Sequence, residues 1–287
     1  MRKLKEFVIE KLILICGLAS IFFVVLIFLF LLKEGLAVFK TVSPFKFLFG
    51  KSWYPISEPA QLGILPLILG SLLVTLGAAI ISIPIGVGCA IYIAEIAPLK
   101  IKEILKAGIE LLAAIPSVVL GFIGMVTLVP LVKTVFHLPT GLTAISGSIM
   151  LAFMAMPTIV SIAEDALYSV PKTYKEGALA LGATHWQTIW RVMLPAASSG
   201  ILAAVMLGIG RVIGETMAVM MITGNAAVIP NSILAPVRTL TATIAAEMGE
   251  AVVGAEHYFA LFAVGIVLFV ISFAINVTAD LFLHKRQ

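Results

Sequence analysis

Long apolar runs separated by short charged segments constrain this chain more than any other feature. Of its 287 residues, 61% are hydrophobic and only 12% are charged. This is more apolar surface than a soluble domain of this size buries. A helix needs about 20 apolar residues to cross the hydrocarbon core of a bilayer. The sequence therefore predicts an all-α integral membrane protein.

Hydropathy predicts six transmembrane helices. Their expected ranges are residues 12–32, 64–93, 107–132, 144–163, 196–223 and 258–283. The first run follows a basic start and exceeds the apolar core of a signal peptide, so we interpret it as an uncleaved span. Six spans place both termini on one side of the membrane.

The distribution of basic residues indicates which side this is. On the side of the termini, the predicted segments carry twelve of the 19 lysines and arginines, and the opposite segments carry six. Cytoplasmic segments carry the excess of lysine and arginine in membrane proteins. We therefore expect cytoplasmic termini in a multi-pass protein of the cytoplasmic (inner) membrane.

We expect two parts along the chain. Residues 1–63 comprise an N-terminal tail, the first span and an outer aromatic segment, and residues 64–287 form a core with five spans and a cytoplasmic loop at 171–195. The aromatic residues suit an interfacial belt; they are Phe45, Phe47, Phe49, Trp53 and Tyr54. A second outer segment, 224–257, contains a predicted short helix over 237–249.

Three predicted spans contain an internal proline, namely Pro84, Pro116 and Pro157. A proline removes one backbone hydrogen bond and bends the helix. In a membrane, such bends persist where neighbouring helices or water satisfy the freed carbonyls. We expect these spans to face protein, either to shape the bundle or to line a pore.

The loop at 171–195 predicts two short helices. Pro171 suits the first turn of a helix, and Gly182 suits the left-handed conformation that ends one. Thr184 and Gln187 form a capping-box pattern that starts the second helix, which stops near Pro195. The apolar residues of this second helix are predicted to share one face at the membrane surface; they are Trp186, Ile189, Trp190 and Met193.

This loop resembles the EAA loop of ABC importer permeases. The resemblance rests on Glu176-Gly-Ala178, Gly182, Ile189 and Leu194-Pro195. It implies that Glu176, Gly177, Ala178 and Gly182 dock on a cytoplasmic ATPase, although Gly177 stands where the general pattern has alanine. The chain has no G-x-x-x-x-G-K-[ST] phosphate loop, so ATP must be bound by another chain.

Further segments resemble the PstC-type permease subunit of the phosphate-specific importer. They are Phe47-Leu-Phe-Gly-Lys-Ser-Trp53, Gly63-Ile-Leu-Pro-Leu-Ile-Leu-Gly70, Ile115-Pro-Ser-Val118, Gly121-Phe122, Glu164-Asp-Ala166, Gly210-Arg-Val-Ile-Gly-Glu-Thr-Met-Ala-Val219 and Gly224-Asn225. The resemblance implies type I importer permease architecture and four kinds of partner: a PstA-type permease, two PstB-type ATPases, an extracytoplasmic phosphate-binding protein, and phosphate itself.

Arg211 and Glu215 lie four residues apart in the fifth predicted span. Ionised groups within a membrane are costly, which makes a function the default hypothesis for them. On one helix they share a face and are expected to pair, either as a structural salt bridge or as part of an anion pathway. Gly208, Gly210 and Gly214 allow close helix approach nearby. We expect Glu164 and Asp165, by contrast, to be solvated.

Other functional classes find little support. Cys16 and Cys89 lie far apart in apolar runs and the four histidines lack ligand spacing, so we expect no disulfide, metal site or cofactor. The chain lacks the catalytic constellation that a membrane enzyme needs. It also lacks the basic stretch of a nucleic-acid binder. If the chain were a secondary transporter, the loop at 171–195 would have no explanation. Within the importer class, sulfate, molybdate and tungstate remain alternatives to phosphate.

Overall fold

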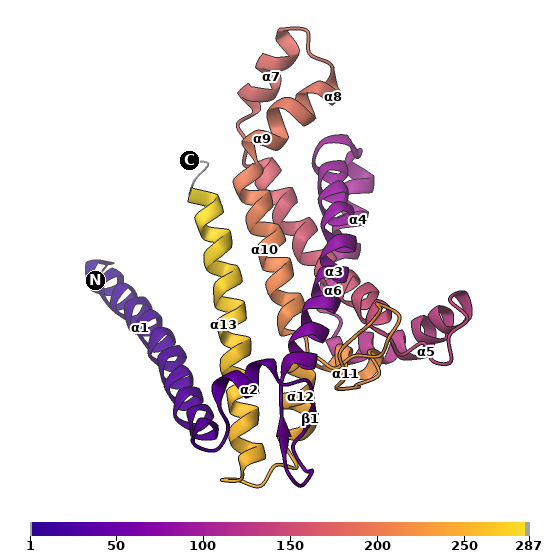
Figure 1. The fold of residues 1–287 in the computed structure, drawn as a ribbon. Coiled ribbons are helices and arrows are strands. Elements are labelled where there is room, and N and C mark those ends of the chain that lie inside the picture. The colour runs from indigo at the N-terminus through magenta and orange to yellow at the C-terminus, as the bar shows by residue number, and fades with distance from the viewer. Residues whose placement is uncertain (1, 285–287) are drawn as a thin grey trace.

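A bundle of long helices with one projecting loop makes up the computed structural model, which describes residues 2–284 (Figure 1). The long helices are α1 Arg2–Gly35, α3 Leu65–Ile91, α4 Leu99–Ala114, α5 Ser117–Val135, α6 Ala144–Tyr168, α10 Ser198–Gly214 and α13 Glu256–His284. The shorter elements are η1 Leu36–Lys40, α2 Pro44–Phe49, β1 Trp53–Tyr54, β2 Gln61–Leu62, η2 Tyr92–Ile96, α7 Lys172–Ala180, α8 His185–Thr188, η3 Ile189–Met193, α9 Leu194–Ala196, α11 Met217–Ile222 and α12 Leu240–Glu247.

The described residues contain five helices that are long and apolar enough to cross a membrane. A sixth span is counted if His185–Ala196 and Ser198–Gly214, which meet at 70°, are taken together. Helices α1 and α13 run antiparallel, so the start of α1 and the end of α13 point toward the end of the bundle from which α7 and α8 project (Figure 1). That both termini lie on one side of the membrane stays a prediction, with which this arrangement of α1 and α13 agrees.

Helix α3 packs along α6, and α10 packs on α6 as well, which forms the centre of the bundle. Small residues permit this approach, because a Cβ on Gly77 would lie 2.4 Å from Ser148 Oγ. The same hydroxyl donates to the Val74 carbonyl at 3.2 Å. Close backbone contact through small residues is how membrane helices gain packing energy without a hydrophobic effect.

The third predicted span, 107–132, is wrong. It joins the second half of α4 to the first part of α5, which are separate helices. Pro116 is the N-cap of α5 and Ile115 before it is extended, because the ring of a proline disfavours helical conformation in the preceding residue. Pro84 and Pro157 remain inside α3 and α6 as predicted.

The two outer segments fold onto each other at the end of the bundle opposite the loop. Phe47 and Trp53 are buried with residues of α12 and α13, so the prediction of an interfacial belt is wrong for these two. Trp53 Nε1 donates to the Glu247 carboxylate at 3.0 Å, which also contacts Arg238 and His257. The division of the chain at residue 63 stays a prediction.

Candidate functional site

The loop at 171–195 forms the two helical pieces that its sequence predicts. Helix α7 follows Pro171, and Gly182 adopts a φ of +85° just beyond its end. The capping box is formed: Thr184 Oγ1 accepts from the Gln187 backbone N–H at 3.2 Å, and Gln187 Oε1 accepts from the Thr184 N–H at 2.9 Å. The second piece runs through α8, η3 and α9. The loop is therefore an ordered projection.

Helix α7 leaves its outer surface bare. None of its residues is buried, and a Cβ on Gly177 would meet nothing within 4 Å. At its end, Leu181 is 91% exposed, and Leu179 and Tyr174 are exposed as well. Exposed apolar side chains that gather on a projecting element mark an interaction surface. Ala178, by comparison, is half-buried.

The four apolar residues of the second piece do not share one face. Ile189 and Met193 are buried against Ile91 and the end of α6. Trp186 and Trp190 are exposed, with their rings edge to face at 5.8 Å. The prediction is wrong because η3 is a π-helical turn, whose i to i+5 bonding shifts the register that an α-helix would keep.

Both halves of the loop contact one residue, Glu95, in the π-helical turn η2 that follows α3. Lys175 Nζ of α7 lies 2.5 Å from the Glu95 carboxylate. His185 Nε2 of α8 lies 3.2 Å from the Glu95 backbone oxygen. Because a carbonyl oxygen only accepts, Nε2 is the protonated nitrogen. Sequence reasoning missed Glu95, and only its position at the end of a long apolar run gave a signal.

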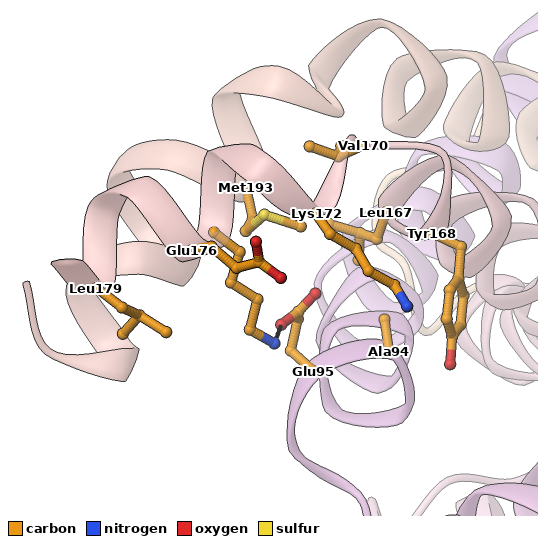
Figure 2. A pocket seen from close by; sticks show the side chains of 10 residues that line it. Ala94, Glu95, Leu167, Tyr168, Val170, Lys172, Glu176, Leu179 and Met193 are labelled. Atoms are coloured by element: carbon orange, nitrogen blue, oxygen red, sulfur yellow. Dashed lines mark hydrogen bonds and ion pairs between the residues drawn. The ribbon is translucent and has the colours of Figure 1, made fainter.

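A cavity of about 300 Å³ lies beside this ion pair, between α7, η2 and the end of α6. Its lining residues are Ala94, Glu95, Leu167, Tyr168, Val170, Lys172, Lys175, Glu176, Leu179 and Met193. Figure 2 shows that the Glu176 carboxylate points into this cavity, toward Glu95. Of the predicted docking residues, Glu176 thus lies on the inner side of α7, whereas Gly177 is open to the outside.

Glu164 is not the solvated charge that the sequence predicts. It is only 2% exposed, with Lys102 and Lys106 of α4 each 3.4 Å from one of its oxygens. Lys102 Nζ also lies 3.6 Å from the centre of the Tyr168 ring. This ionic cluster joins α4 to α6 near the loop. Asp165 is 68% exposed, as predicted.

The predicted pair of Arg211 and Glu215 is wrong. Helix α10 ends at Gly214, and Glu215 is extended, which turns the two side chains away from the i to i+4 geometry of a helix. Arg211 Nη1 instead donates to Thr158 Oγ1 of α6 at 3.3 Å. Glu215 Oε1 accepts from the Ala218 N–H at 3.3 Å and so caps α11. Among the described residues Arg211 forms no ion pair.

The backbone carbonyl that is freed at the break between α10 and α11 forms a hydrogen bond with another part of the chain. Thr241 Oγ1 donates to the Glu215 carbonyl at 2.8 Å, as the low dielectric of a membrane requires for irregular backbone. The predicted span 196–223 is therefore two helices. Gly208 contacts Ile159 tightly, whereas a Cβ on Gly210 or Gly214 would meet nothing within 4 Å. One face of α10 thus lacks a packing partner within residues 2–284.

Comparisons with known proteins agree with this geometry. Residues 82–286 match the family described as Binding-protein-dependent transport system inner membrane component. The chain is 42% identical over 274 residues to the "Probable ABC transporter permease protein YqgH" of Bacillus subtilis, covering 95% of this chain and 89% of that one. It is 37% identical over 260 residues to the "Phosphate transport system permease protein PstC" of Mesorhizobium japonicum, covering 84% and 79%.

Among solved structures, the fold resembles a chain of the bacterial alginate ABC transporter, solved in complex with an alginate pentasaccharide-bound periplasmic protein. The TM-score is 0.65 and the identity is 17%, with 94% of this chain and 93% of that chain covered. At this level of identity the likeness concerns the fold alone. The architecture of five or six spanning helices and a projecting loop is that of type I ABC importer permeases.

Proposed function

The chain belongs to the family of binding-protein-dependent transport system inner membrane components, and from this membership we propose that it is a permease subunit of an ATP-driven importer of inorganic phosphate. The observation that carries the substrate is the similarity to chains named as PstC phosphate permeases, of which several are 35–37% identical to it over most of its length. The exposed loop α7 to α9 supports the coupling to an ATPase.

We assign ATPase docking to the outer side of α7. Gly177 offers a surface without a side chain, and Gly182 turns the chain so that Leu181 projects. Ala178 and Glu176 complete the predicted docking set, with Glu176 acting from the cavity side of the helix. Two copies of a PstB-type ATPase are the expected partners, since hydrolysis takes place on separate chains.

We assign the anion pathway to the region around Arg211. A guanidinium without a carboxylate partner keeps its charge available for an anion, whereas a closed salt bridge would not. Glu215 has a different role in this proposal, because it holds the break between α10 and α11 that shapes the pathway. The bare face at Gly210 and Gly214 is where a PstA-type permease would close the pathway.

The orientation of the chain in the membrane follows from the assignment of ATPase docking to α7. The loop that meets an ATPase must be cytoplasmic, and the start of α1 and the end of α13 point toward the same end of the bundle (Figure 1), which supports cytoplasmic termini. The excess of lysine and arginine in the same segments agrees with this orientation. The Trp53, Arg238, Glu247 and His257 cluster then faces outward, on the side of the extracytoplasmic phosphate-binding protein.

Another oxyanion is the second candidate substrate. The relative that is 42% identical carries the printed name of an ABC permease without a stated substrate, and one arginine does not distinguish phosphate from sulfate, molybdate or tungstate. The selectivity between these anions is expected to reside mainly in the external binding protein.

Co-purification followed by ATPase measurements tests the proposal. The chain is expressed with its partner permease and ATPase, and the complex is reconstituted in liposomes. The binding protein is then added to the assay. Phosphate should stimulate hydrolysis, and sulfate and molybdate should not. A purified chain that hydrolyses ATP alone, or a complex stimulated by sulfate and not by phosphate, contradicts the proposal.

A further inference from the structure

The loop reaches the three central helices in two different ways. It is continuous in sequence with α6 before α7 and with α10 after α9, so these helices follow any movement of the loop directly. Helix α3 has no such connection, yet it packs along α6 for most of its length. Noncovalent contacts alone join α3 to the loop.

Those contacts converge on Glu95. Its side chain is only 7% exposed and its carboxylate meets Lys175 of α7, while its backbone oxygen meets His185 of α8. The other contact is apolar, where Ile91 packs with Ile189 and Met193. Apolar contacts are not directional, so they resist sliding less than an ion pair with fixed geometry does.

Helix α7 is held to the bundle weakly elsewhere. None of its residues is buried, and the cavity of about 300 Å³ separates part of its inner side from α6 and η2 (Figure 2). The ion pair at 2.5 Å is therefore the directional attachment of α7 to the end of α3. The helical path of the chain ends directly after η2, because Ala97 is extended and Pro98 follows it.

We propose that Glu95 is a positioning residue for energy coupling, through which movement of the loop displaces α3. When the ATPase moves α7 and α8, Lys175 and His185 draw the end of α3 with them. This inference rests on the proposed docking of the loop on an ATPase.

Glu95→Gln in the reconstituted complex is the first test, with ATP hydrolysis and phosphate uptake measured in the same liposomes. Hydrolysis should persist, and uptake per ATP hydrolysed should fall about fivefold or more. Glu103→Gln is the matched control, because Glu103 is an exposed carboxylate on the neighbouring α4. It should leave the ratio unchanged.

Charge reversal separates positioning from a merely structural role. Glu95→Lys and Lys175→Glu should each lower the ratio of uptake to hydrolysis, and the double variant should restore it. A structural role would instead lower assembly and thermal stability and leave the ratio of the assembled complex intact. A normal ratio in Glu95→Gln, or a double variant no better than the worse single one, contradicts the inference.

A readout independent of phosphate separates this inference from the proposed function. Cys89 is an exposed native cysteine on α3, six residues before Glu95, and it can carry a spin label after Cys16→Ser. Addition of ATP should change the label mobility in the otherwise unaltered complex and not in Glu95→Gln. Equal changes in both contradict the role of Glu95, whereas a mobility change without any phosphate uptake contradicts the substrate alone.

Discussion

Arg211 donates to the hydroxyl of Thr158 at 3.3 Å, and this contact replaces the salt bridge to Glu215 that the sequence predicts. A hydroxyl is neutral, so no carboxylate of the described residues compensates the positive charge of the guanidinium. Such a charge is costly within a membrane, which favours a function over a structural role. Arg211 lies in the last turn of α10, just before the break at Glu215.

Arg211→Ala should abolish phosphate uptake in complexes that still assemble. Unit charges 4 Å apart attract by about 4 kcal/mol at an effective dielectric of 20, and about 1.4 kcal/mol is a factor of ten, so even a partial loss lowers uptake at least about tenfold. Arg211→Lys retains the charge and should retain part of the uptake. Near-normal uptake in Arg211→Ala would remove Arg211 from the pathway.

Glu215→Ala should destabilise the start of α11 by about 1 kcal/mol, since it removes a side-chain cap. Glu215→Gln keeps an acceptor oxygen and should keep both the thermal midpoint and most of the uptake. Thermal unfolding of the purified complex checks the first effect. If Glu215→Gln stops uptake without lowering the midpoint, the carboxylate charge itself acts in transport.

Gly177→Trp should leave the folding of the subunit unchanged and break its binding to the ATPase. A Cβ at this position would meet nothing within 4 Å, so a bulky side chain has open space around its base and is expected to interfere with a partner rather than with the subunit itself. Gly17→Trp on α1, which also meets nothing within 4 Å, is the control. Co-purification of the ATPase should be lost in the first variant and kept in the second; equal recovery contradicts the docking assignment.

Glu164→Gln should destabilise the subunit by about 3 kcal/mol, because removal of one partner leaves Lys102 buried without a counter-charge. Asp165→Asn changes the adjacent, exposed carboxylate and should cost about 0–1 kcal/mol. Thermal unfolding in the same detergent compares the two. Similar small shifts in both variants would show that the Lys102 and Glu164 cluster does not hold α4 to α6.

Local signals along the chain predicted the fold well where the physics is local. The capping box at Thr184 and the left-handed Gly182 depend on neighbouring residues alone, and both are confirmed. The break at Glu215 was not predicted, because it depends on Thr241, which satisfies the freed carbonyl from 26 residues away. Hydropathy averages over neighbouring residues and therefore does not detect such a long-range contact.

The same limit applies to the charges of the site. The partner of Glu95 lies 80 residues along the chain, and the partner of Glu164 lies on another helix. Charge spacing in sequence predicts pairs within one helix, which is why Arg211 and Glu215 were expected to meet. Partners on different helices follow from packing, and only the structure brings them together.

ATP-driven uptake of radiolabelled phosphate into liposomes is the most direct test of the central claim. The liposomes contain this chain, its partner permease and the ATPase, and the binding protein is supplied on the outer side. The account predicts uptake that requires both ATP and the binding protein, with little uptake of labelled sulfate under the same conditions. Uptake that continues without ATP, or a complex that carries sulfate and not phosphate, would contradict it.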